Sequence, residues 1–87
     1  MYRVTGNTEW ESGTVQNISE SGVSFIGEQP VVSGVDLELI FVMPQEITGQ
    51  RNSKVLCRGE VARVAGDRMG HFFVAVVMSG YSFLPED

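Results

Sequence analysis

The sequence predicts a small all-β domain, a six-stranded antiparallel barrel formed by residues 1–87 as a single unit. Three observations point to this fold class. Apolar and polar residues alternate in several segments, as they do in strands that bury one face. The chain contains 10 glycines among its 87 residues, and hardly any stretch has the apolar period of a helix. Turn-forming residues separate the alternating segments at short intervals, which is typical of small β domains.

Three short strands are expected in the first third of the chain. The third of them, GVSFIG, directs Val23 and Phe25 toward the core. Gly22 opens this segment, and we expect it to lie in a turn that needs a positive φ angle, which selects glycine. The expected strands cover residues 2–6, 13–17 and 22–27.

Three longer strands are expected in the rest of the chain, over residues 36–43, 53–64 and 70–78. The first two alternate, whereas residues 72–78 are apolar on both faces, as in a central or covered strand. Residues 44–53 are expected to form the longest loop, and residues 79–87 either a short helical turn or an aromatic cap on the barrel end. A barrel is favoured over an open sheet because closure removes exposed edges. Leu37, Leu39, Phe41 and Met43 share one face of the first of these strands, and Val55, Cys57, Gly59 and Val61 one face of the second; in the third, Phe72, Val74, Val76 and Met78 oppose Phe73, Ala75 and Val77.

Composition excludes several classes of function. A net charge of −5 argues against DNA or RNA as a partner, because nucleic-acid binding needs a basic surface. One cysteine, Cys57, and one histidine, His71, cannot supply an intrachain disulfide or a structural zinc site. No catalytic constellation is present, so the protein is not expected to be an enzyme or to carry a cofactor. Without an apolar run long enough for a membrane span or a secretory signal, a cytoplasmic location is expected.

One polar stretch, QNISESGVSF at residues 16–25, stands out. It contains Asn17, Ser19 and Gly22 in the order N-x-S-x-x-G, between the second and third expected strands. An aliphatic-x-aromatic strand follows, and SGVDLEL comes after it in the expected order. The stretches GTVQNISESGVSF, VLCRGEVARV and FFVAVVM follow one another in the order found in PilZ domains. Through them nearly the whole chain resembles the PilZ domain family.

This resemblance implies a split six-stranded barrel that binds the bacterial second messenger cyclic di-GMP. In that family the Asx-x-Ser-x-x-Gly turn contacts guanine and phosphate, which assigns Asn17, Ser19 and Gly22 to the ligand. A second motif, R-x-x-x-R before the first strand, supplies arginines that pair with phosphate. This chain has no R-x-x-x-R; Arg3 is its only basic residue before Arg51, and Asn7 stands four positions after it. Arg3 is therefore the candidate for a basic ligand contact.

Three hypotheses for the function stay open. The first is a regulatory module that binds cyclic di-GMP. The second is a degenerate PilZ-like module that has lost the ligand and binds a protein partner or a second copy, suggested by the missing arginines and by the apolar residues 72–78. The third, an OB-like nucleic-acid binder, is disfavoured by the acidic composition. Asn17 and Ser19 could instead cap their own turn and have no contact with a ligand. Trp10 either caps the barrel end or offers an exposed aromatic ring to a partner.

Overall fold

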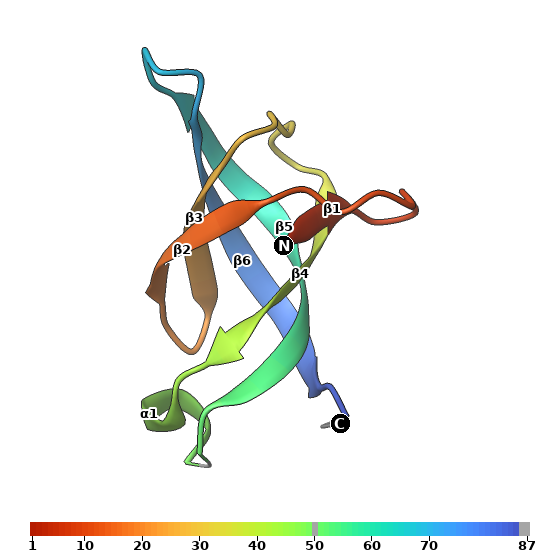
Figure 1. The fold of residues 1–87 in the computed structure, drawn as a ribbon, viewed down its shortest axis with the longest axis vertical. Coiled ribbons are helices and arrows are strands. Elements are labelled where there is room, and N and C mark those ends of the chain that lie inside the picture. Colours follow the sequence, from red (N-terminus) through yellow and green to blue (C-terminus); the bar gives the residue numbers. More distant parts are fainter. Residues whose placement is uncertain (50, 86–87) are drawn as a thin grey trace.

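The computed structural model describes residues 1–49 and 51–85, without the side chain of Thr48. Strands dominate this part of the chain, and a helix of one turn interrupts them once (Figure 1). The elements are β1 (Tyr2–Val4), β2 (Gly13–Ile18), β3 (Gly22–Gly27), β4 (Asp36–Met43), α1 (Gln45–Thr48), β5 (Ser53–Gly66) and β6 (Phe72–Phe83).

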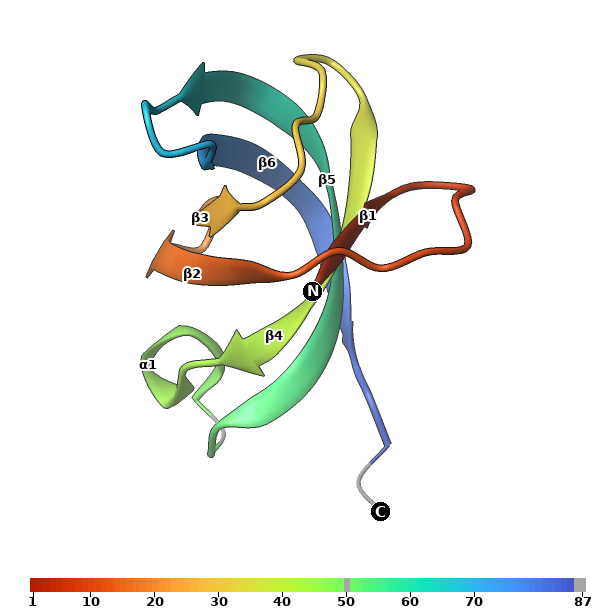
Figure 2. The ribbon, with the colours of Figure 1, turned by 45° about the horizontal axis from the view of Figure 1, so that its top comes forward.

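All six strands belong to one antiparallel sheet, with the order β1-β4-β5-β6-β3-β2. The sheet curls strongly, so that its two edge strands approach each other (Figure 2). They meet at a bridge between Tyr2 and Glu11, where the two backbone hydrogen bonds measure 2.9 and 2.8 Å. The predicted six-stranded antiparallel barrel of the split type is thus confirmed.

The core lies inside the curl and follows the predicted alternation. Val23 and Phe25 are buried on the inner face of β3, as expected. Phe41, Phe72 and Met78 are only partly buried and pack against this core. The fully buried inward positions of β4, β5 and β6 are Leu37, Leu39, Met43, Val55, Cys57, Val61, Val74 and Val76.

Tyr2 anchors the closure of the barrel. Its ring is 2% exposed and packs against Phe25 with the ring centroids 4.6 Å apart. Its hydroxyl donates to the Gln29 carbonyl oxygen at 2.7 Å and accepts from the Gln29 N–H at 2.9 Å. Gly27 leaves room for this hydroxyl, since a Cβ there would lie 2.5 Å from it. The hydroxyl thus ties β1 to the segment that follows β3.

Two predicted segments differ from the structure. Residues 79–85 form no helical turn, because β6 continues to Phe83 and pairs with β5 as far as Val55; residues 86–87 of the expected tail lie outside the described residues. This pairing satisfies backbone groups that a short isolated helical turn would leave partly unsatisfied. The expected loop at residues 44–53 contains the single-turn helix α1, which ends at Gly49 with a φ of 76°. No helix of the described residues has the length and apolar character that crossing a membrane requires.

Candidate functional site

The predicted turn residues come together at the β2–β3 hairpin. The Ser19 N–H donates to the Gly22 carbonyl oxygen at 2.8 Å, and the Ser19 hydroxyl reaches the same oxygen at 3.4 Å. Asn17, Ser19 and Gly22 line one shallow depression of about 200 Å³ on the outer face of the sheet. The sequence alone did not indicate two further lining residues, Ser24 on β3 and Ala75 on β6, because their position depends on strand pairing.

A β-bulge in β2 directs Asn17 into this depression. Val15 pairs with Phe25 on the inner face, but the register shifts after it and Asn17 pairs with Ser24 on the outer face. Strict alternation from Val15 would have turned Asn17 toward the core, and a bulge is a common means of re-aiming a side chain. Within residues 1–49 and 51–85, the exposed Asn17 amide has no hydrogen-bond partner. Its donor and acceptor are therefore free for a ligand.

Gly22 has a different role from the one expected of it. Its backbone does not adopt a positive φ angle, and it opens strand β3 rather than lying in the turn. The expectation of a left-handed turn residue was therefore wrong. A Cβ at Gly22 would lie 3.0 Å from the Val76 carbonyl oxygen. The absence of a side chain allows β3 and β6 to approach closely at the edge of the depression.

Arg3 is engaged elsewhere. Its Nε lies 3.0 Å from Oε1 of Glu38, a carboxylate whose side chain is only 12% exposed. The Arg3 guanidinium also stands 4.2 Å from the centroid of the Trp10 ring. Arg58 approaches the other oxygen of Glu38, Oε2, at 3.8 Å. Trp10 thus covers Arg3 on the outside of β1, and Arg3 compensates a carboxylate that is largely removed from water.

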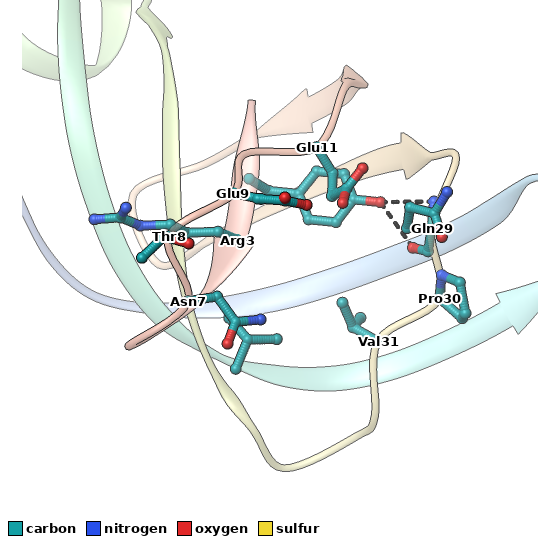
Figure 3. A pocket seen from close by; sticks show the side chains of 10 residues that line it. Arg3, Asn7, Thr8, Glu9, Glu11, Gln29, Pro30 and Val31 are labelled. Carbon is teal, nitrogen blue, oxygen red and sulfur yellow. Dashed lines mark hydrogen bonds between the residues drawn. The ribbon is translucent and has the colours of Figure 1, made fainter.

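A second cavity, of about 400 Å³, lies beside Arg3 (Figure 3). The carboxylates of Glu9 and Glu11 line it, and the Arg3 side chain extends away from the side formed by Gln29 (Figure 3). Glu11 pairs with Tyr2, and Asn17 lies six residues after Glu11, roughly 20 Å along the strand. The structure therefore brings Asn17, Ser19 and Gly22 together but leaves Arg3 at the other end of β2. Its contact with a ligand stays a prediction.

The remaining reactive side chains form no catalytic arrangement with the depression. Cys57 is fully buried, and burial raises the pKa of its thiol to about 11. His71 is exposed near Asp67, and the His71 backbone N–H, which donates to the Asp67 carboxylate, lowers the pKa of Asp67. The described part of the chain contains no group of three or more His, Cys, Asp or Glu placed to hold a metal ion. The depression offers hydrogen-bonding groups on a concave surface, which are the features that binding sites use.

The comparison with known families agrees with the fold. The model of the PilZ domain matches residues 1–86, which is essentially the whole chain. No curated protein and no solved structure matches the chain.

Proposed function

The chain belongs to the PilZ domain family, and we propose that it is a regulatory module that binds cyclic di-GMP at the depression lined by Asn17, Ser19 and Gly22. One observation carries the proposal. The bulge in β2 aims the Asn17 amide outward, where it has no partner among the described residues. A polar side chain that only served the turn would be expected to bond to it, as Ser19 does.

The chemistry of the three residues suits a guanine base. The Asn17 amide offers both a donor and an acceptor, which a guanine edge can match with its own acceptor and donor. The Ser19 hydroxyl makes only a long bond of 3.4 Å to the Gly22 carbonyl oxygen, so it can rotate toward a ligand at little cost. Gly22 removes side-chain bulk and lets a flat ring approach the backbone.

The proposal is tested by calorimetric titration of cyclic di-GMP into the wild-type chain, Asn17→Ala and Thr14→Ala. Thr14 is the matched control, because it is also exposed on β2 but pairs with Ile26 and lies outside the depression. Asn17→Ala is expected to weaken binding about 10-fold or more, since it removes hydrogen bonds to a base. Thr14→Ala should bind as the wild type does. Equal affinity of Asn17→Ala and the wild type would refute the site.

A second candidate function is a protein-interaction module. The outer face of β6 carries Val77, which is 57% exposed. Tyr81 and Phe83, at 41% and 44% exposed, pair with Cys57 and Val55 and lie on the other face of the strand. An exposed apolar residue such as Val77 can belong to a contact surface. A second copy bound at Val77 would make sedimentation of the wild type faster than that of Val77→Lys. Identical monomeric sedimentation of both would count against a second copy.

A further inference from the structure

The geometry points to Arg63 as the basic residue of the ligand site, where its guanidinium would bind a phosphate of a nucleotide whose base lies at Asn17. This inference rests on the proposed function and names a contact outside the N-x-S-x-x-G turn. Arg63 belongs to β5, far from the turn in the sequence, and strand pairing brings it to the same outer face.

A single row of residues crosses four strands from Asn17 to Arg63. Asn17 on β2 pairs with Ser24 on β3, and Ser24 pairs with Ala75 on β6. Ala75 in turn pairs with Arg63 on β5. Neighbouring strands lie about 4.8 Å apart, so the Cα atoms at the ends of the row are separated by about 14 Å. The depression that contains Asn17 and Ser24 extends along this row as far as Ala75.

A second β-bulge aims Arg63 at this face. Val61 is buried and pairs with Val76, but the register shifts after it, and Arg63 pairs with Ala75 while Val64 pairs with Val74. Without the shift, alternation from Val61 would have turned Arg63 into the core. The bulge in β2 does the same for Asn17. Two independent irregularities therefore place polar side chains at opposite ends of one row.

The middle of the row is a shallow trough. Ser24 and Ala75 are small, and both are partly exposed. The adjoining rows of the outer face carry larger apolar side chains, Ile26 beside Phe73 on one flank and Val77 on the other. A flat base can lie over small residues between such walls, since apolar flanks shield it from water. The phosphate on the ribose of this base would then reach the side of Arg63.

Arg63 is available for an anion. Its guanidinium carbon stands 5.9 Å from the centroid of the Phe73 ring, and no ion pair holds it within the described part of the chain. Arg3 and Arg58, by contrast, both approach the Glu38 carboxylate. The planar fork of an arginine near an aromatic ring can still bind two phosphate oxygens.

The test compares the affinity of cyclic di-GMP for the wild-type chain, Arg63→Ala, Arg63→Lys and Arg58→Ala by calorimetric titration. Arg58 is the matched control, because it is an exposed arginine of the same strand that contacts Glu38 instead of the row. Arg63→Ala is expected to bind about 10-fold to 100-fold more weakly, and Arg63→Lys to fall in between, since lysine keeps the charge without the fork. Arg58→Ala should match the wild type. Unchanged thermal unfolding of Arg63→Ala would show that the loss is not one of folding.

The outcomes separate the inference from the function on which it rests. Binding by the wild type and by Arg63→Ala with equal affinity would overturn the role of Arg63 and leave the proposed function standing. An equal loss in Arg63→Ala and Arg58→Ala would also overturn it, because net charge alone would then explain the effect. No binding by the wild type would overturn both. A loss confined to the Arg63 variants supports the contact.

Discussion

Replacing Arg3 by Ala is expected to destabilise the barrel and to leave ligand affinity unchanged. The substitution removes a charge-assisted hydrogen bond of 3.0 Å to Glu38, whose side chain is 12% exposed, and a cation–π contact of 4.2 Å with Trp10. The hydrogen bond contributes about 1.5–3 kcal/mol and the cation–π contact about 0.5–1 kcal/mol, so a loss of about 2–4 kcal/mol is expected. For a domain of this size, such a loss lowers Tm by about 10–30 °C.

Urea unfolding followed by Trp10 fluorescence measures the loss, and Arg58→Ala is the control. Arg58 reaches the same carboxylate, but at 3.8 Å and with 63% of its side chain exposed, so its removal should cost less than about 1 kcal/mol. In Arg3→Ala/Glu38→Gln the cost should be smaller than the sum of the two single changes, because the second change removes the uncompensated carboxylate. The reasoning is refuted if Arg3→Ala unfolds like the wild type but binds cyclic di-GMP 10-fold more weakly, for Arg3 would then be a ligand contact.

Three further predictions concern the core. Tyr2→Phe removes two hydrogen bonds to Gln29 and should lower the free energy of unfolding by about 1–2 kcal/mol, measured by urea unfolding. Gly59→Ala places a Cβ 2.5 Å from the Val77 carbonyl oxygen and should cost about 1–3 kcal/mol; an unchanged midpoint would contradict this close approach. Burial raises the pKa of Cys57 to about 11, above the value of 9.0 for a free thiol, so its neutral form is favoured in the fold. Its contribution to stability should be complete below pH 9 and lost between pH 9 and about 11, as unfolding midpoints across that range would show.

Alternation predicts the buried faces of this sheet well because burial is decided by local spacing. Val23 and Phe25 lie inside β3 as their period of two requires. The same rule fails at the bulges, where the inward residues are three positions apart. VQNI runs from Val15 to Ile18, and VARV runs from Val61 to Val64. An apolar pair at this spacing inside a strand is the local signal that would have indicated these two bulges; β5 and β6 have a third register shift, between Arg58 and Gly59.

The partners of the candidate site could not be predicted from the sequence, because they depend on strand order. The N-x-S-x-x-G turn identified Asn17 and Ser19, which are close in the chain. Ala75 and Arg63 join them only through the pairing of β3 with β6 and of β6 with β5. Arg3, the candidate to replace the missing motif arginines, contacts Glu38 and Trp10, which the sequence did not indicate, and its contact with a ligand stays a prediction.

The contacts of the arginines suggest how an acidic barrel keeps a basic group for a ligand. The chain has 6 basic and 11 acidic residues, so most exposed arginines are expected to find a carboxylate. Glu38 attracts Arg3 and Arg58 because its burial makes an unpaired charge costly. Arg63 escapes such pairing because its bulge sets it opposite Ala75 and beside Phe73. A bulge interrupts regular pairing and so weakens a strand locally. The two bulges bend the curled sheet and also expose Asn17 and Arg63 in one row, so one feature of the backbone can serve both the fold and the proposed site.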